Sequence, residues 1–79
     1  MPESMKVIDL HGKNCFQAEK MIEAALRKSY GLYRIRLIHG FHSGVSLKNF
    51  IWENYGNDPR ILRISGFNAG STDLILREL

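Results

Sequence analysis

Apolar residues in this chain fall into four short runs that are separated by polar or glycine-containing segments. The second run alternates apolar side chains with two arginines, which is the period of a half-buried strand. The other runs are short and bounded by glycine, asparagine or proline, as strands usually are. We therefore expect four strands, over residues 6–10, 33–38, 61–65 and 72–76.

Two stretches between these runs place apolar residues at the spacing of a helix face. The first follows Asn14, a good N-cap, and Gln17 stands where a capping box needs it. The second stretch ends at Gly56. Apolar residues recur at three- and four-residue intervals in both, which predicts two amphipathic helices. The stripes are Ala18, Met21, Ile22, Ala25 and Leu26 in the first helix and Leu47, Phe50, Ile51 and Tyr55 in the second.

The order of these elements is β-α-β-α-β-β. Strands that alternate with helices favour right-handed crossovers and parallel pairing. The short loop over residues 66–71 predicts instead an antiparallel hairpin of the last two strands. Because Arg34 and Arg36 share one face of the second strand, we expect both helices on the opposite face. The predicted fold class is therefore an α+β, or α/β, two-layer sandwich with a four-stranded mixed sheet.

Composition limits the class of protein. The single cysteine, Cys15, excludes an internal disulfide and a four-cysteine zinc site, and it fits a reducing compartment. No apolar stretch approaches the roughly 18 residues of a membrane helix, and the N-terminus does not resemble a signal peptide. We expect a cytoplasmic monomer whose single domain spans residues 6–79 after a flexible tail at residues 1–5. The net charge of +3 permits a polyanionic partner without requiring one.

All three histidines lie in two short segments that follow predicted strands. His11 follows the first strand, whereas His39 and His42 follow the second. Parallel strands deliver their carboxyl ends to one edge of a sheet, which is where open α/β folds bind ligands. Gly40 and Gly44 in the second segment would let a phosphate approach the backbone closely. The pattern predicts a phosphate-sized cleft between the two segments.

Acid–base chemistry is the reaction type that these residues favour. Imidazole titrates near neutral pH, and Asp9 lies close enough to His11 to orient a histidine ring. The ordinary alternative is a His11 that merely closes the strand end by hydrogen bonding to Asp9 or to the backbone. Too few carboxylates are near for a two-metal nuclease site. We expect no tightly held cofactor, and at most one weakly held Mg²⁺ or Mn²⁺.

Basic and aromatic residues supply candidate contacts to nucleic acid. Arg34, Arg36 and Arg63 are expected on the uncovered face of the sheet, with Lys13 at its edge, where they would form a track for phosphates. A solvated face that keeps an open sheet in solution is the alternative for these arginines. Phe41 stands in the second histidine segment and is a candidate for stacking on a base.

Three motifs resemble those of the Smr (small MutS-related) domain family, over residues 6–78. They are Ile8-Asp9-Leu10-His11-Gly12, which resembles LDLHG, Ile38-His39-Gly40, which resembles the start of HGxG, and Gly70-Ser71-Thr72-Asp73-Leu74-Ile75-Leu76, which is similar to G-x-T-x-V-x-L. The resemblance implies a fold like the C-terminal domain of bacterial translation initiation factor 3. It also implies nucleic-acid binding and, in several members, endonuclease activity. Asp9, His11 and His39 would be the active residues, with Gly40 in the substrate loop.

The second motif departs from the family pattern, because His42 replaces its second glycine. The replacement changes the backbone freedom of the loop and adds a side chain. We expect a stand-alone nucleic-acid-binding domain that acts as a small endonuclease on phosphodiester bonds of RNA or DNA. The alternative is a binding module without catalysis, for structured DNA or ribosomal RNA. A third hypothesis is protein–protein interaction through the open face of the sheet.

Overall fold

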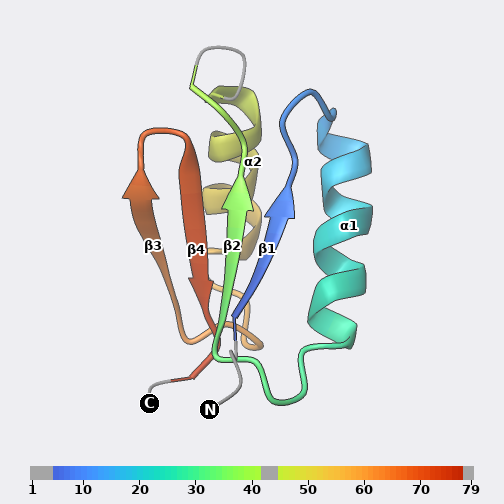
Figure 1. Cartoon of the computed structure of the whole chain (residues 1–79), viewed down its shortest axis with the longest axis vertical. Coiled ribbons are helices and arrows are strands. Elements are labelled where there is room, and N and C mark those ends of the chain that lie inside the picture. Colours follow the sequence, from blue (N-terminus) through green and yellow to red (C-terminus); the bar gives the residue numbers. More distant parts are fainter. Residues whose placement is uncertain (1–4, 42–44, 78–79) are drawn as a thin grey trace.

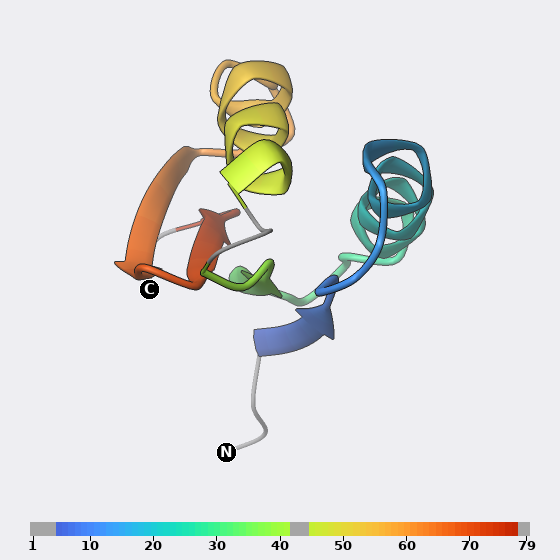
Figure 2. The same cartoon turned by 90° about the horizontal axis from the view of Figure 1, so that it is seen from above.

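The computed structural model describes residues 5–41 and 45–77, and a four-stranded sheet runs through it with two helices on one face (Figures 1 and 2). In chain order the elements are β1 (Met5–Asp9), α1 (Cys15–Arg27), β2 (Arg34–Ile38), α2 (Val45–Tyr55), β3 (Arg63–Asn68) and β4 (Ser71–Ile75). The predicted element order and the two-layer sandwich are confirmed. Of the expected N-terminal tail, Met5 belongs to β1 and residues 1–4 lie outside the described residues.

The strands are arranged in the order β1-β2-β4-β3. β1 pairs with β2 in parallel, and β4 pairs antiparallel with both β2 and β3. The sheet is therefore mixed, and the last two strands form the predicted hairpin. Because β4 is inserted between β2 and β3, the carboxyl ends of β1, β2 and β3 all point to one edge (Figure 1). The loops that carry the sequence motifs are gathered at this edge.

The core lies between the helices and the covered face of the sheet. The two predicted apolar stripes supply its helical side, and Ile35 and Leu37 of β2 are completely buried beneath them. Each such side chain contributes about 1.5–3 kcal/mol through removal from water. The capping box forms as predicted, because the Asn14 side chain accepts from Gln17 N and the Gln17 side chain accepts from Asn14 N. Within the described ranges, neither helix is long and apolar enough to cross a membrane.

Strand boundaries differ most from the prediction in β3. This strand begins at Arg63 and continues to Asn68, whereas the sequence predicted its end at Ser65 and a loop over residues 66–71. Gly66 pairs with Thr72, but the next pairing is Asn68 with Ser71, so the ladder contains a β-bulge at Phe67. Backbone pairing with β4 outweighs the turn preference of glycine and asparagine here. The other strands begin or end within one or two residues of the prediction.

An ionic cluster occupies the face of the sheet opposite the helices. Asp73 of β4 is only 1% exposed and lies between Arg34 and Arg36 of β2. Arg34 Nη1 donates to Asp73 Oδ2 at 2.7 Å. Arg36 donates through Nε to Oδ1 at 2.9 Å and through Nη2 to Oδ2 at 3.0 Å, a bidentate arrangement. One carboxylate thus serves two guanidinium groups, and the cluster keeps one net positive charge.

Replacement of Asp73 by asparagine tests what this cluster contributes to stability. Asp73→Asn keeps the shape of the side chain but leaves both guanidinium groups without a counter-charge. We expect the free energy of unfolding, measured by urea denaturation, to fall by about 3 kcal/mol. Glu53→Gln, on the exposed surface of α2, removes a carboxylate as a matched control and should change stability by less than about 0.5 kcal/mol. Equal losses in the two variants would contradict a stabilising role for Asp73.

Candidate active site

Three segments meet at the carboxyl edge of the parallel strands (Figure 1). They are the turn after β1, the residues that follow β2, and the β3–β4 turn. Leu10 N donates to Ile38 O at 2.7 Å and joins the first two segments. The carbonyl oxygen of Gly70 accepts from both His39 N at 2.9 Å and Gly40 N at 3.0 Å. Backbone hydrogen bonds therefore hold the three motif-bearing segments together.

Gly40 is the point at which the turn after β1 and the segment after β2, the two expected walls of a cleft, come into contact. Its φ is +89°, in the left-handed region where a side chain would be strained. A Cβ atom built on Gly40 would lie 3.9 Å from His11 Cβ, with no closer neighbour outside the adjacent residues. The turn after β1 and the segment after β2 are therefore adjacent, as the sequence predicted.

Asp9 and His11 form a hydrogen-bonded dyad at this edge. Asp9 Oδ1 accepts from His11 Nδ1 at 2.5 Å and from His11 N at 3.1 Å. The chain turns sharply beyond His11, since Lys13 N donates to Leu10 O at 3.0 Å and Gly12 has φ +79°. Both side chains of the dyad remain accessible, at 72% exposure for His11 and 56% for Asp9. The dyad is thus built by local turn geometry and faces solvent.

The carboxylate determines what the His11 ring can do. An ionised carboxylate only accepts hydrogen bonds, so the His11 proton that it receives is on Nδ1 and the Nε2 lone pair of the neutral ring is directed elsewhere. Within the described part of the chain, Nε2 has no hydrogen-bond partner. The side-chain and backbone hydrogen bonds from His11, with the nearby charge of Lys13, hold the pKa of Asp9 below its usual value of 3.8. Asp9 therefore stays ionised, and the neutral His11 ring has its unprotonated Nε2 on the side away from the carboxylate.

His39 has a different environment. Its side chain is buried, at 2% exposure, and both ring nitrogens have partners inside the protein. Nδ1 lies 3.0 Å from Gly40 O, which can only accept, so Nδ1 carries a proton. Nε2 lies 3.0 Å from Thr72 Oγ1, which also accepts from Trp52 Nε1 at 3.1 Å. The hydroxyl proton of Thr72 is therefore available to Nε2 of a neutral His39.

This network separates the two histidines that the sequence placed together. Both reach the same edge, as expected, but only His11 presents its ring to solvent. His39 lies beneath the edge, where it fixes the carbonyl of Gly40 and connects β2 with β4 and α2. In this arrangement His39 holds Gly40, and both of its ring nitrogens have partners inside the protein.

The remaining candidates of the cleft are only partly described. Lys13 is exposed in the turn beside His11, and Phe41 is exposed immediately after Gly40. His42 and Gly44 lie outside the described residues. Among the described residues, the edge therefore offers Lys13, two residues after His11, and Phe41, which follows the Gly40 that lies against His11.

The predicted arginine track lies on the open face of the sheet, away from the helices. Arg34 and Arg36 are engaged with Asp73 as described above, and side-chain exposures of 29% and 19% leave part of each accessible. Arg63 shares a register row with Arg34 through Ile75, so it lies on the same face. The three arginines thus share one surface, but Asp73 offsets part of its positive charge.

Sequence reasoning assigned no role to Thr72, Asp73 or Phe67. A signal was present for the first two, because they are polar residues in a run that is otherwise apolar. Consecutive residues of a strand point to opposite faces, so one must face the core and the other the open side. Buried polar groups require partners, which here are His39 for Thr72 and the arginines for Asp73. Phe67 gave no comparable signal, since its position depends on the bulge.

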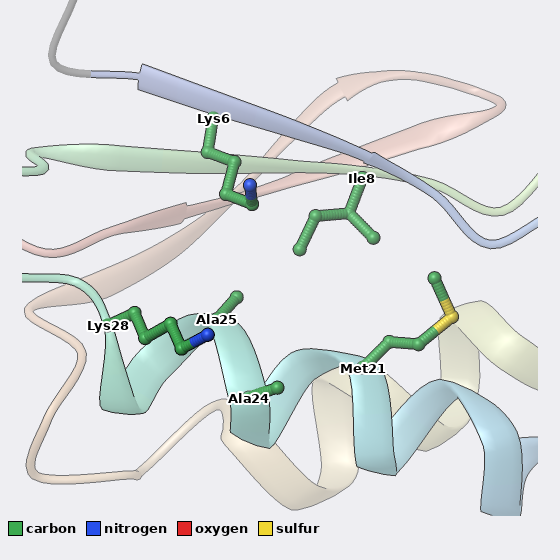
Figure 3. Close-up of a pocket in the computed structure, with 6 residues that line it drawn as sticks. All are labelled: Lys6, Ile8, Met21, Ala24, Ala25 and Lys28. Carbon is green, nitrogen blue, oxygen red and sulfur yellow. The ribbon is translucent and has the colours of Figure 1, made fainter.

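A groove of about 340 Å³ lies elsewhere, between β1 and α1 (Figure 3). Ile8 and the α1 residues Met21, Ala24 and Ala25 form its walls, and the amines of Lys6 and Lys28 approach it at one end. Lys28 follows the last residue of α1 and Lys6 is near the start of β1, so the groove opens toward the end of the sheet opposite His11. Across residues 5–41 and 45–77, no group of three or more His, Cys, Asp or Glu side chains is arranged to hold a metal ion.

Comparisons with known proteins give a consistent result. No protein-family model matches the chain. Endonuclease MutS2 of Carboxydothermus hydrogenoformans is 32% identical over 60 residues, which cover 73% of this chain but only 8% of that protein. The crystal structure of the Smr domain of Thermus thermophilus MutS2 superposes with a TM-score of 0.79 at 28% identity. That match covers 92% of this chain and 99% of the Smr-domain chain.

The fold and the three motif segments at one edge define a domain of the Smr type. Similarity extends over nearly the whole chain in the structural comparison. The chain belongs to the Smr domain family. It spans about 8% of the length of the MutS2 protein that it matches, which is the share expected of one domain.

Substitution of Thr72 tests the buried network. Thr72→Val preserves shape but removes the hydroxyl that links His39 to Trp52. We expect the free energy of unfolding to fall by about 1–3 kcal/mol, because Nε2 of the buried His39 and Nε1 of Trp52 both lose their partner. The ¹⁵N signals of the His39 ring should shift as Nε2 loses its donor, as followed by NMR. Thr72→Ser keeps the hydroxyl and should retain the ring signals of the wild type. Unchanged His39 signals in Thr72→Val would contradict the network.

The dyad is tested by titration of Asp9. His11→Ala removes the hydrogen bond that contributes most to the lowered Asp9 pKa, so this pKa should rise toward 3.8. In the wild type the folded pKa lies below the unfolded one. The Asp9–His11 pair therefore stabilises the fold at pH values above the unfolded-state pKa of Asp9. This stabilisation is lost as the pH falls through the folded-state pKa of Asp9. Carboxyl ¹³C NMR measures the pKa of Asp9 in the wild type and in His11→Ala. Asp58, whose pKa is lowered by Arg60 at the other end of the sheet, should titrate identically in both.

Proposed function

We propose that this Smr domain binds nucleic acid and cleaves its phosphodiester bonds, with His11 as general base and Asp9 as the group that orients it. The observation that carries this proposal is the accessible ring of His11, whose Nδ1 is hydrogen-bonded to Asp9 so that Nε2 is directed away from the carboxylate. A relative that bears the name endonuclease supports the same function. Lys13 beside the dyad would contact phosphate oxygens, and Gly40 would allow the backbone of the substrate to approach.

RNA suits this set of residues better than DNA. The 2′-hydroxyl of RNA is an internal nucleophile, so a single well-placed base can start cleavage. Nε2 of His11 would take the 2′-hydroxyl proton, the 2′-oxygen would bond to phosphorus, and the bond from phosphorus to the 5′-oxygen would break. Because attack and departure are in line, one imidazole cannot serve both oxygens, and water would protonate the departing 5′-oxygen. The products would be a 2′,3′-cyclic phosphate and a 5′-hydroxyl.

The burial of His39 favours a second candidate, a nucleic-acid-binding module without catalysis. A two-histidine mechanism needs an acid and a base that both reach the substrate. His39 instead donates to Gly40 O and faces Thr72. Between His11 and His39, only His11 has an accessible ring, so the Asp9–His11 dyad could instead serve to hold a phosphate. The two candidates therefore differ in whether His11 moves a proton.

Cleavage of defined substrates separates these two candidates. We expect wild-type protein to cut structured or single-stranded RNA and to leave cyclic-phosphate ends, as detected by gel electrophoresis and mass spectrometry. His11→Ala should lose at least about 100-fold in rate, the usual share of a general base, and Asp9→Asn should lose less. Glu53→Gln removes a carboxylate far from the dyad and should cut at the wild-type rate.

The same cleavage assay with supercoiled DNA, and with or without Mg²⁺ or Mn²⁺, identifies the substrate and any need for an ion. Equal background cleavage by wild type and His11→Ala on every substrate would refute the enzyme and leave the binding module. The module itself predicts affinity that falls with rising salt and survives Asp9→Asn. Affinity that does not depend on salt would contradict both candidates.

A further inference from the structure

The open face of the sheet carries an aromatic ring that nothing in the proposed chemistry uses. Phe67 occupies the β-bulge between Gly66 and Asn68, and its ring lies over the guanidinium of Arg36, with Cζ 3.5 Å from the ring centroid. The residue is still 55% exposed. One face of the ring thus packs on Arg36, and a large part of the residue stays accessible on the side of the sheet that no helix covers (Figure 2).

The support beneath this ring is rigid. Arg36 makes two hydrogen bonds to Asp73, which is 1% exposed and also holds Arg34. A guanidinium fixed at two points keeps its plane, so the stacked ring is held in one orientation before any ligand arrives. Binding to such a surface loses little side-chain entropy. We call Phe67 and Arg36, with Asp73 beneath them, the stacking platform.

Charge and position suggest what the platform binds. Two guanidinium groups share one carboxylate, which leaves one net positive charge beside an exposed aromatic ring. Asp9 lies on the same face, because its register row crosses the sheet through Ile38 and Ser71 to Asn68, next to Phe67. Neighbouring strands are about 4.8 Å apart, so three strand spacings, about 14 Å, separate Asp9 on β1 from Asn68 on β3. The same open face therefore carries the platform and the residue that orients His11.

We propose that the stacking platform binds an unpaired nucleobase, so that the substrate of this domain is a single-stranded or unpaired stretch of nucleic acid. Bases within a duplex are stacked on their neighbours and cannot present a free face to a ring on a flat sheet. Aromatic side chains exposed on an open sheet stack on unpaired bases in known RNA-binding modules, and every base has a suitable face. The proposal rests on the proposed function, and it names the substrate class of that site.

The platform also orients the strand toward the dyad. A base on Phe67 lies near the centre of the sheet, whereas His11 follows the end of β1 at the sheet edge. A strand that leaves the platform toward β1 would bring a neighbouring phosphate to His11 Nε2 and Lys13. The platform would thus determine which unpaired nucleotide lies next to the bond that is cleaved. It would contribute to affinity without taking part in proton transfer.

Binding of short fluorescein-labelled oligonucleotides tests the proposal. The probes are a single-stranded RNA, the DNA strand of the same sequence, and the blunt duplex of each, measured by fluorescence anisotropy. We expect the wild type to prefer single strands, and Phe67→Ala to weaken single-strand binding about tenfold while leaving duplex binding unchanged. The RNA and DNA strands distinguish which nucleic acid the surface accepts.

Three further variants make the result specific. Phe67→Leu keeps an apolar side chain without the ring and should weaken binding as Phe67→Ala does, so a folding defect in the alanine variant would not obscure the outcome. Phe67→Tyr keeps the ring and should restore affinity. Tyr30→Ala removes a fully exposed aromatic from the α1–β2 loop, at the opposite end of the molecule, and should bind as the wild type does.

Cleavage and binding distinguish failure of this inference from failure of the proposed function. His11→Ala should abolish cleavage but keep the preference for single strands. Phe67→Ala should raise KM and leave kcat within about twofold, since it alters binding in substrate and transition state alike. The inference is overturned if Phe67→Ala and Phe67→Leu bind single strands as tightly as the wild type, if the wild type prefers duplex, or if no probe binds.

Discussion

Every residue of β4 is buried, yet Ser71, Thr72 and Asp73 at its beginning are polar, and the site depends on how these groups are satisfied. A buried polar group that lacks a partner costs several kcal/mol, so each must be paired on its own side of the sheet. Thr72 faces the helices and pairs with His39, whereas Asp73 faces the open side and pairs with Arg34 and Arg36. One central strand therefore organises both the edge with the dyad and the open face with the platform.

The consequences of the Thr72 contact extend to the cleft. His39 receives the Thr72 hydroxyl on one nitrogen and donates to the carbonyl of Gly40 with the other. The Gly70 carbonyl accepts from the two backbone N–H groups of the same segment, so Gly40 is held from both directions. The left-handed backbone of Gly40 then lies against His11 without a side chain between them. The three family motifs are thus three parts of one hydrogen-bonded unit.

The sequence was sufficient for features that depend on local periodicity. The helix stripes, the Asn14 cap and the strand–helix alternation each leave a repeating pattern, and burial of apolar surface makes that pattern decisive. The position of β4 between β2 and β3 leaves no such pattern, because strand order depends on contacts between distant segments. The β-bulge at Phe67 was missed for the same reason, since only the pairing of β3 with β4 shows where the extra residue lies.

The environment of His39 could have been predicted but was not. His39 has the same parity as Ile35 and Leu37, whose side chains face the helices, so continuation of β2 directs its ring inward. Asp9 has the opposite parity to Ile8 and faces the open side, where its dyad with His11 is exposed. The sequence analysis used residue type alone and therefore gave both histidines the same role. Strand parity assigns them different environments, and the buried His39 links Gly40 to Thr72.

The open face of the sheet continues into the edge that carries the dyad, so the proposed ligand approaches His11 from this face. Asp9 is the last residue of β1, and its register row crosses the sheet to Asn68, beside the ring of Phe67. A ligand that lies flat on this face thus reaches the dyad from the side where the carboxylate orients His11. The helices lie on the other face of the sheet (Figure 2). In the proposed mode of binding, the stacking platform, the accessible His11 ring and Gly40 together place a single strand whose bases are unpaired.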